Sequence, residues 1–369
     1  MNDAIKLEGH NPQWFADFEL ERARILAALG HVTEGGILEQ VHHVGSSSVP
    51  GLKAKPVIDI LLEVYPLPKP EVGIPALEKL GYEYKGEAGI AGRLFFRNNP
   101  RTRHVHVVEA GTNEFTRDHL LFRDYLRANV GASTRYENLK LELAQQHPSD
   151  REAYLRGKTD LIRELLREAT VWHLEVTGFQ PILELKELMQ GFQKEWCIPS
   201  GWALDAFVGA PSRYHFDLDL LIWREDQLAL RQHLLDQGWE LHVPVDGVYH
   251  PWAADEFLEL PLHQVHARKD GRFLDILLSD CDAECWRFRR DPQITHDISS
   301  VMLPSSLGLK ILAPEIVLLF KSRSSGGDAR SKDHQDFARA LRYLPAKSRE
   351  WLKLALQKTS PEHAWLAEL

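Results

Sequence analysis

Two aspartates one residue apart, Asp217 and Asp219, are the residues whose types and spacing most clearly could do chemistry. In a β-strand, side chains at positions i and i+2 lie on the same face, so both carboxylates would face one place. Without a cation between them such neighbours repel, and one would stay protonated. Hard cations such as Mg2+ take oxygen ligands and keep positions open for phosphate oxygens. The pair therefore indicates a metal site, although an isolated Asp-x-Asp is more often a solvated strand face.

A third acid, Asp275, interrupts the apolar run 272–278, which follows an Asp-Gly turn. This pattern predicts a hairpin strand beside the strand that carries the aspartate pair. A buried carboxylate without a partner costs on the order of several kcal/mol. Asp275 therefore either has a partner or belongs to the same site, and we predict the site.

A turn of small residues, Ser200-Gly201, precedes the segment 202–208, whose apolar residues recur at helical spacing up to Gly209. The free N–H groups and the positive dipole end at a helix start favour anions. Glycine also lets a phosphate approach the backbone closely. We predict that Ser200 and Gly201 contact the phosphates of a nucleotide.

Four motifs follow one another in the second half of the chain. They are Ser200-Gly-Trp-Ala-Leu-Asp205, Arg213-x-His215-x-Asp217-x-Asp219, Ala313-Pro-Glu315-Ile-Val-Leu-Leu-Phe-Lys321 and Lys332-Asp333-His-Gln-Asp336-Phe337. Through them residues 178–343 resemble the aminoglycoside and lincosamide nucleotidyltransferases of the DNA polymerase β-type superfamily. Relatives usually show Gly-Gly at the turn, where this chain has Ser200-Gly201. The wider superfamily tolerates this change.

The resemblance implies transfer of a nucleoside monophosphate from an NTP, with ATP as the expected donor, to a hydroxyl of a small molecule. Two Mg2+ ions would be held by Asp217 and Asp219. Asp275 would bind the ion that activates the hydroxyl and is the candidate base. Lys321 and Lys332 could neutralise phosphate charge, with solvated lysines as the open alternative.

The first half repeats the plan with Gly45 and Ser46 ahead of an acid-bearing strand that contains Asp59. It resembles the GrpB (UPF0157) family over roughly the first 170 residues. The likeness continues through Arg103-His-Val-His106-Val-Val, Phe122-Arg-Asp-Tyr-Leu-Arg127 and Tyr154-x-x-Gly157-Lys158-Thr159. The resemblance predicts phosphate contacts at Gly45 and Ser46. Lys53 and Lys55 beside the loop could also meet phosphate, although a solvated loop is the default.

The chemistry of the first half is less complete, because the position two residues after Asp59 is Leu61 rather than an acid. We therefore expect one metal at most, bound through Asp59. His104 and His106 share a strand face, and neutral imidazoles can bind a transition metal. A site made by Asp59 with this pair and a role in packing or hydrogen bonding are equally open.

The length of 369 residues and the hydrophobic content of 44% are compatible with two globular domains. We predict an α+β fold with two nucleotidyltransferase-type domains, 1–172 and 178–369, each a small mixed sheet flanked by helices. The seam is expected near 169–178, between a charged helix at about 150–168 and a helix at 181–194. The segment 243–252, with two prolines and a glycine, predicts a loop over the site.

A formal net charge of -9 and a pI near 6.1 argue against a nucleic-acid partner, which needs a basic stripe. Acidic residues around a pocket would suit a polycationic acceptor. Three cysteines give no disulfide framework. We see no signal peptide and no apolar stretch of about 18 residues, so we expect a cytoplasmic protein without a membrane partner.

Two functions from different classes remain after these observations. The first is a metal-dependent nucleotidyltransferase with catalysis mainly in the second half. The second is a nucleotide- or partner-binding regulator that keeps the fold with little or no turnover. Release of pyrophosphate would separate the two, whereas metal-dependent NTP binding would not.

Overall fold

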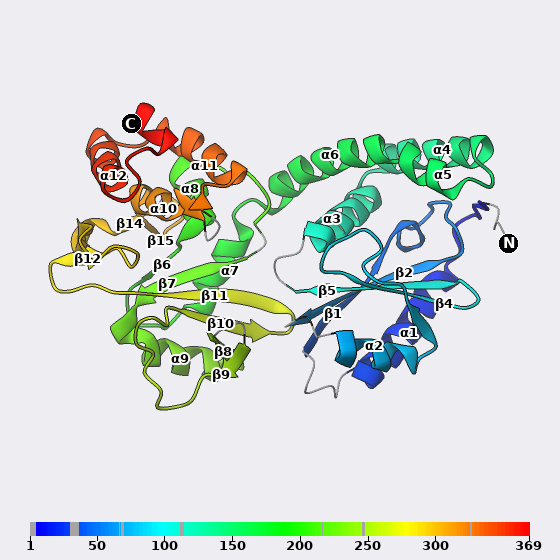
Figure 1. Ribbon diagram of the computed structural model, residues 1–369, viewed down its shortest axis with the longest axis horizontal. Helices are drawn as coiled ribbons and strands as arrows, with labels where there is room; N and C mark the ends of the chain where they lie inside the picture. The colour runs from blue at the N-terminus through cyan, green and yellow to red at the C-terminus, as the bar shows by residue number, and fades with distance from the viewer. Residues whose placement is uncertain are drawn as a thin grey trace. The chain divides into compact units, whose positions relative to one another are not determined.

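The structure is a computed structural model that describes residues 5–29, 37–65, 67, 70–110, 114–215, 217–245, 248–324 and 327–369. The chain divides into two compact units, Met1–Val176 and Thr177–Leu369 (Figure 1). The division falls at the end of helix α6 (Thr159–Thr177), which runs through the segment where we expected the seam.

The N-terminal unit contains a five-stranded mixed sheet in the order β1-β2-β5-β4-β3. Its strands are β1 (Ile37–Val44), β2 (Ile58–Tyr65), β3 (Tyr82–Tyr84), β4 (Leu94–Asn98) and β5 (Arg103–Glu109). Strand β2 pairs antiparallel with β1 and parallel with β5, which places Asp59 opposite His104. A short 3-10 helix (Ser46–Ser48) follows β1.

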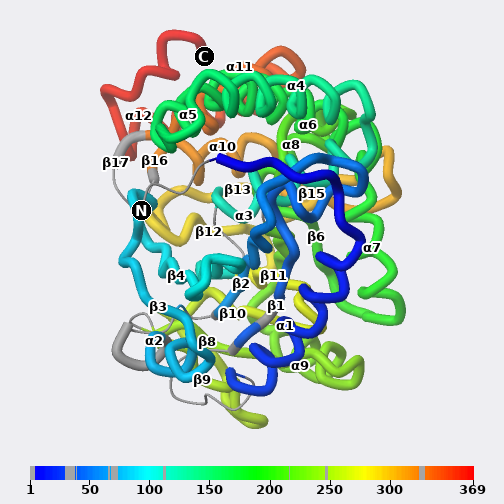
Figure 2. The backbone as a smooth tube through the Cα atoms, turned by 90° about the vertical axis from the view of Figure 1, so that its right-hand side faces the viewer, coloured from blue at the N-terminus to red at the C-terminus, as the bar shows by residue number. Residues whose placement is uncertain are grey.

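Helices cover both faces of this sheet. They are α1 (Gln13–Leu29), α2 (Pro70–Glu78), α3 (Glu114–Ala128), α4 (Val130–Gln146), α5 (Arg151–Gly157) and α6. Alternate residues of β2 take opposite faces. Ile60 packs with Phe18 of α1, whereas Leu61 packs with Phe115 and Leu120 of α3. Helices α4, α5 and α6 follow one another beside α3 (Figures 1 and 2). Asp59 therefore lies on the α3 face of the sheet.

The C-terminal unit contains a six-stranded mixed sheet in the order β6-β7-β11-β10-β8-β9. Its strands are β6 (Trp196–Cys197), β7 (Asp219–Trp223), β8 (Glu240–Val245), β9 (Val248–Pro251), β10 (Gln264–Lys269) and β11 (Arg272–Ser279). Strand β11 forms a hairpin with β10 and runs parallel to β7, with Asp275 opposite Asp219. The predicted position of β11 beside the strand of the aspartates is confirmed.

Within the described residues, α-helices and small two-stranded ribbons complete this unit. The helices are α7 (Gln180–Leu188), α8 (Ser200–Val208), α9 (Gln227–Asp236), α10 (Pro314–Lys321), α11 (Ser331–Leu341) and α12 (Ala346–Thr359). The ribbons pair β12 (Cys285–Arg287) with β13 (Thr295–Asp297), β14 (Met302–Pro304) with β15 (Lys310–Leu312), and β16 (Arg323–Ser324) with β17 (Gly327–Asp328). Both units are thus small mixed sheets flanked by helices, as predicted.

Three local predictions were wrong. The segment 243–252 is not a loop, because β8 and β9 form a hairpin within it. Its prolines are tolerated since β8 pairs with β10 only through 240–242, which leaves Pro244 outside that ladder. The helix expected at 150–168 is two helices that meet at Lys158, and the helix expected at 181–194 ends at Leu188.

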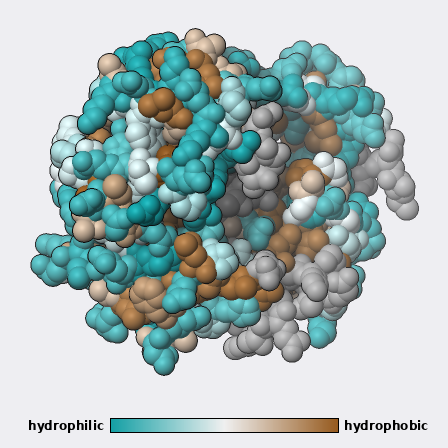
Figure 3. Space-filling view, turned by 60° about the vertical axis from the view of Figure 1, so that its left-hand side comes forward, coloured by the Kyte–Doolittle hydropathy of each residue, from teal (hydrophilic) through white to brown (hydrophobic). Residues whose placement is uncertain are grey.

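The molecular face in Figure 3 is mainly hydrophilic, with smaller hydrophobic groups among the polar ones. The large apolar side chains of the C-terminal unit instead form one buried cluster that includes Trp202, Leu220, Ile276 and Leu318. Among the described residues, no helix has the length and apolar character to cross a membrane.

Candidate functional site

The three predicted acids line one cavity of about 570 Å3 in the C-terminal unit. Asp219 begins β7 and Asp275 lies opposite it in the parallel strand β11. Asp217 lies two residues before Asp219 and lines the same cavity. The predicted residues Ser200, Gly201, Lys321 and Lys332 are also among its lining residues. The structure therefore brings the proposed metal ligands and phosphate contacts to one place.

The carboxylates of this cavity repel one another. Burial, followed by the charges of Asp217 and Asp275, raises the pKa of Asp219 well above its usual value, against a hydrogen bond from Ser200. Burial raises the pKa of Asp275 to about 7, with a further contribution from Asp217. Gln264 Nε2 donates a hydrogen bond of 2.7 Å to Asp275 Oδ2, which acts in the opposite direction. These shifts indicate an excess of negative charge in a poorly hydrated place.

The donor set fits a hard divalent cation such as Mg2+. It consists of carboxylate oxygens only, and the buried Asp275 Oδ1 has no hydrogen-bond partner among the described residues. A cation among the acids would relieve their repulsion and occupy that oxygen. As the side chains now lie, no group of three or more His, Cys, Asp or Glu residues in the described ranges is arranged to hold a metal ion. The residue types fit the ion, and binding would need the side chains to close in.

The turn before α8 is shaped by its own neighbours. Ser200 has a positive φ of 61°, a conformation that costs a non-glycine residue about 1–2 kcal/mol. Its side chain hydrogen-bonds Asp219. A Cβ at Gly201 would lie 2.5 Å from Arg213 Nη2 and 2.5 Å from His215 Cε1. The absence of a side chain at Gly201 is therefore required by Arg213 and His215, whereas we had attributed it to an approaching phosphate.

A buried network fixes α8 in place. Arg213 Nη1 donates to His215 Nδ1 at 3.1 Å, so the ring proton lies on Nε2, which donates to Asp205 at 2.8 Å. Asp205 also accepts hydrogen bonds from Ser212 and from Arg339. Asp205, Arg213 and His215 belong to the motifs that carry the resemblance, but we assigned them no role, because a lone Asp in an apolar helix carries no chemical signal. Their position indicates that they hold the start of α8 beside the carboxylates.

The two predicted phosphate-binding lysines differ in their surroundings. Lys321 Nζ lies 2.8 Å from Asp333 Oδ1 and 2.8 Å from Asp336 Oδ2, so its charge already ties α10 to α11. Lys332 has no carboxylate within ion-pair distance among the described residues, and burial together with Arg330 lowers its pKa. Lys332 is therefore the cation of the two that is better placed to accept an anion. The phosphate role of both stays a prediction, and part of the loop 324–327 lies outside the described residues.

The N-terminal unit repeats this arrangement, and its register corrects our comparison of the two halves. Gly45 has a φ of 72°, like Ser200, and a Cβ on it would lie 2.5 Å from Asp59 Oδ2. Asp59 lies opposite His104 in the parallel pair β2–β5, as Asp219 lies opposite Asp275 in β7–β11. Asp59 therefore corresponds to Asp219, the second acid of the pair.

It follows that Leu61 is not the position of the missing acid. That position is Val57, two residues before Asp59, which lines the N-terminal cavity as Asp217 lines the other. Leu61 is fully buried under α3. His104 stands where the C-terminal unit has Asp275. Sequence spacing missed this, because the first acid after the turn was equated with the first acid of the pair.

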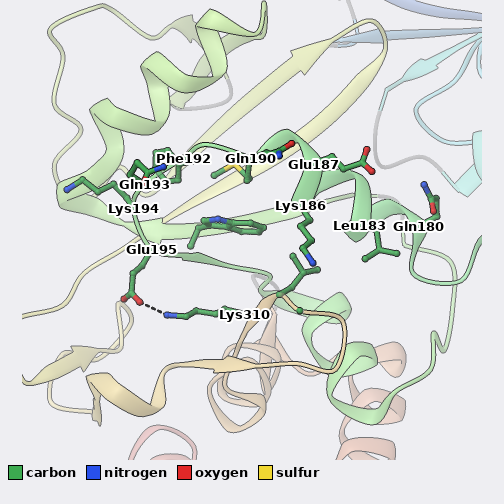
Figure 4. A pocket seen from close by; sticks show the side chains of 14 residues that line it. Gln180, Leu183, Lys186, Glu187, Gln190, Phe192, Gln193, Lys194, Glu195 and Lys310 are labelled. Atoms are coloured by element: carbon green, nitrogen blue, oxygen red, sulfur yellow. Dashed lines mark hydrogen bonds and ion pairs between the residues drawn. The ribbon is translucent and has the colours of Figure 1, made fainter.

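Another hollow, of about 920 Å3, lies along α7 in the C-terminal unit. Its lining includes the ion pair between Glu195 and Lys310, drawn as a dashed line in Figure 4. None of the three aspartates lines it. Without converging carboxylates it offers no chemistry of the predicted kind, and we do not assign the site there.

In comparisons with known proteins, the two halves of the chain match two different families. A family model described as GrpB protein matches residues 4–168, and one described as aminoglycoside-2''-adenylyltransferase matches residues 181–340. UPF0157 protein YqkA of Bacillus subtilis is 39% identical over 165 residues, which cover 44% of this chain and 46% of that protein. The chain thus spans about half the length of that relative.

Two solved structures show the same pattern. A conserved GrpB protein from Enterococcus faecalis is 36% identical and covers 44% of this chain and 96% of its own, with a TM-score of 0.40. ANT(2'')-Ia in complex with adenylyl-2''-tobramycin is 16% identical and covers 49% and 98%, with a TM-score of 0.37. The predicted family assignment is confirmed for both halves. The chain belongs to the GrpB (UPF0157) family through its N-terminal unit, and its second half matches the family model described as aminoglycoside-2''-adenylyltransferase.

Proposed function

We propose that this protein is a metal-dependent nucleotidyltransferase that acts mainly through its C-terminal unit. It would transfer a nucleoside monophosphate from an NTP, with ATP as the expected donor, to a hydroxyl of a small molecule. The observation that carries the proposal is the convergence of Asp217, Asp219 and Asp275 on one cavity, with mutual repulsion that a cation would relieve. The match to an adenylyltransferase family over 181–340 supports it.

The proposed reaction exchanges one phosphorus–oxygen bond for another. The acceptor oxygen bonds to the α-phosphorus, the bond to the leaving pyrophosphate breaks, and the hydroxyl proton passes to a base. Asp275 suits this role, because its carboxylate lies opposite Asp219 in the neighbouring strand and lines the cavity. Gln264 donates to Asp275 Oδ2, whereas Asp275 Oδ1 has no hydrogen-bond partner among the described residues and lies 3.9 Å from His266 Nε2.

The acids would also hold Mg2+, with Asp217 and Asp219 as shared ligands and Asp275 as the third. When bound, the ions would neutralise phosphate charge and lower the pKa of the attacking hydroxyl. The turn at Ser200 and Gly201 offers backbone N–H groups at the start of α8 to the phosphates. Lys332 lines the same cavity and supplies a positive charge.

The acceptor is proposed as a class. The family of the C-terminal domain is named for adenylation of aminoglycosides at the 2'' position, so hydroxyl-rich aminocyclitols are the first acceptors to test. The cluster of Asp217, Asp219 and Asp275 would attract the amino groups of such acceptors. Other small hydroxyl-bearing molecules belong in the same panel.

The direct experiment measures pyrophosphate release from purified protein with Mg2+, each of four NTPs and a panel of acceptors. Asp217→Asn and Asp219→Asn should each abolish release with any acceptor that the unchanged protein uses. Asp236→Asn, an exposed aspartate of α9 outside the cavity, is the matched control and should retain release. Nucleotide binding without pyrophosphate release from any acceptor would instead favour the regulator.

A further inference from the structure

The N-terminal unit contains a cavity of about 380 Å3 whose charge is opposite to that of the chain as a whole. Six lysines or arginines and one carboxylate, Asp59, are among its described lining residues, although the chain carries a net charge of -9. The basic residues are Lys6, Lys55, Arg101, Lys140, Arg151 and Lys158. They come from segments far apart in the sequence, so only the fold gathers them.

Three of these cations, Lys55, Lys140 and Lys158, are held in place by neighbouring groups. Lys55 and Lys158 both lie over the ring of Tyr154, at 4.4 Å and 4.8 Å from its centre. Lys140 is almost fully buried and donates a hydrogen bond to the carbonyl oxygen of Lys53. Among the described residues no carboxylate lies within ion-pair distance of Lys55, Arg151 or Lys158. The partly buried Lys55 and Lys158 and the exposed Arg151 therefore have no carboxylate as an ion-pair partner within the described ranges.

The pKa of Lys140 is lowered by its burial and by a neighbouring positive charge. Burial lowers the pKa of Lys140 to about 7, with a further contribution from the charge of Lys158. Glu137, on the same helix, acts in the opposite direction and raises the pKa. An anion in the cavity would favour the protonated lysine and reverse the shift.

The pKa of Lys55, which lies shortly before β2, is lowered in the same way. Burial lowers the pKa of Lys55 to about 8, and the charges of Arg151 and Lys158 lower it further, whereas Asp59 acts in the opposite direction. At both lysines burial lowers the pKa most, and neighbouring positive charges lower it further. A cavity of this size can hold a small phosphorylated ligand.

The histidines beside Asp59 present protons to it rather than lone pairs. Arg101 Nε donates to His104 Nε2 at 2.9 Å, so the proton of the neutral ring lies on Nδ1, which donates to Asp59 Oδ1 at 2.8 Å. Arg93 Nη1 approaches His106 Nδ1 at 3.2 Å, so His106 Nε2 carries its proton and faces Asp59 at 3.9 Å.

A metal ligand must offer a lone pair on the coordinating nitrogen. Both arginines are donors only, and each occupies the lone pair of one ring. The hydrogen bonds thus favour the structural reading of the histidines over the transition-metal site that was equally open. The metal role of Asp59 stays a prediction. In the structure, the negative charge of Asp59 is balanced by the N–H groups of His104 and His106.

We propose that the N-terminal cavity is an anion site that binds the phosphate groups of a small molecule without a divalent cation. It occupies the same place in the fold as the acidic site of the C-terminal unit, but Val57 and His104 stand where that unit has Asp217 and Asp275. Basic side chains replace the metal as the partner of phosphate. Ser46, at the turn that follows β1, lines the cavity and offers further donors.

The test is calorimetric titration of the full chain with inorganic pyrophosphate and with ATP, in EDTA. EDTA withholds the metal that the proposed transferase reaction needs. Any metal-free binding in the C-terminal cavity is common to all variants, so the difference between them does not depend on the proposed transferase activity. Adding Arg151→Gln and Lys158→Gln should weaken binding by about tenfold or more, because two charged contacts to phosphate are lost. Arg163→Gln, which removes an exposed cation of α6, should change affinity by less than about twofold.

Removal of mutually repelling charges should leave the melting temperature unchanged or higher, so loss of binding would not report unfolding. Arg151→Gln alone serves if the double change does not fold. Tighter binding of ATP than of pyrophosphate would identify a nucleotide, and equal binding would identify the phosphate chain as the feature recognised. The proposal is overturned if neither ligand binds in EDTA, if binding requires Mg2+, or if the cavity variants bind as well as Arg163→Gln.

Discussion

Gly45→Ala tests whether the turn after β1 is built around Asp59. The added Cβ would lie 2.5 Å from Asp59 Oδ2, and Asp59 cannot simply move aside because His104 holds it at 2.8 Å. The positive φ of 72° costs an alanine about 1–2 kcal/mol. Displacing the charged hydrogen bond costs about 1.5–3 kcal/mol. We expect a total loss of about 2.5–5 kcal/mol in the free energy of unfolding.

Gly51→Ala is the matched control. Gly51 also has a positive φ, of 81°, but no atom lies within 4 Å of the position of its Cβ. It should therefore show the backbone cost alone, about 1–2 kcal/mol. Urea unfolding of the full chain, with midpoints and slopes compared, measures both. In an Asp59→Ala background the extra cost of Gly45→Ala should disappear.

The reasoning is refuted if Gly45→Ala costs no more than Gly51→Ala, or if its cost is the same with and without the Asp59 carboxylate. Either result would mean that Asp59 does not approach the turn as closely as the structure has it. The correspondence between Asp59 and Asp219 would then lose one of its supports.

Three further predictions concern the two cavities. Leu61→Asp should unfold the N-terminal unit or lower its stability by about 3 kcal/mol or more, because it buries a charge under α3. Val57→Asp, at the cavity wall, should lower the stability less. Thermal unfolding of the two variants measures the difference. Asp275→Asn should abolish pyrophosphate release yet raise the melting temperature in EDTA, since it removes a buried, repelled charge. The affinity of the N-terminal cavity for pyrophosphate should fall as the pH rises through about 7 and about 8, the pKa values of Lys140 and Lys55. The reason is that pyrophosphate binding favours the protonated forms of both lysines. Titrations across this pH range that show an unchanged affinity would contradict the prediction.

Local sequence patterns predicted several of the elements that form the C-terminal site. The helical spacing at 202–208 with Gly209 after it predicted α8, which ends where Gly209 takes a φ of 90°. The apolar run around Asp275 predicted strand β11 and its position beside the strand that carries Asp219. These features depend on residues close in sequence, so pattern and propensity suffice to find them.

Features set by long-range pairing could not be predicted in this way. The match of Asp59 to Asp219 depends on the register of β2 against β5, which no local spacing encodes. The basic cavity is assembled from positions between Lys6 and Lys158, each of which looks like an ordinary surface cation when taken alone. The ring protons of His104 and His106 depend on arginines that only the fold brings near.

The account rests on the claim that the C-terminal carboxylates support nucleotidyl transfer. The most direct measurement is the mass of each acceptor after incubation with the protein, Mg2+ and an NTP. We expect one acceptor to gain the mass of a nucleoside monophosphate, with equimolar pyrophosphate, and no gain with Asp217→Asn or Asp219→Asn while Asp236→Asn is active. An equal gain of mass with the two cavity variants would contradict the claim.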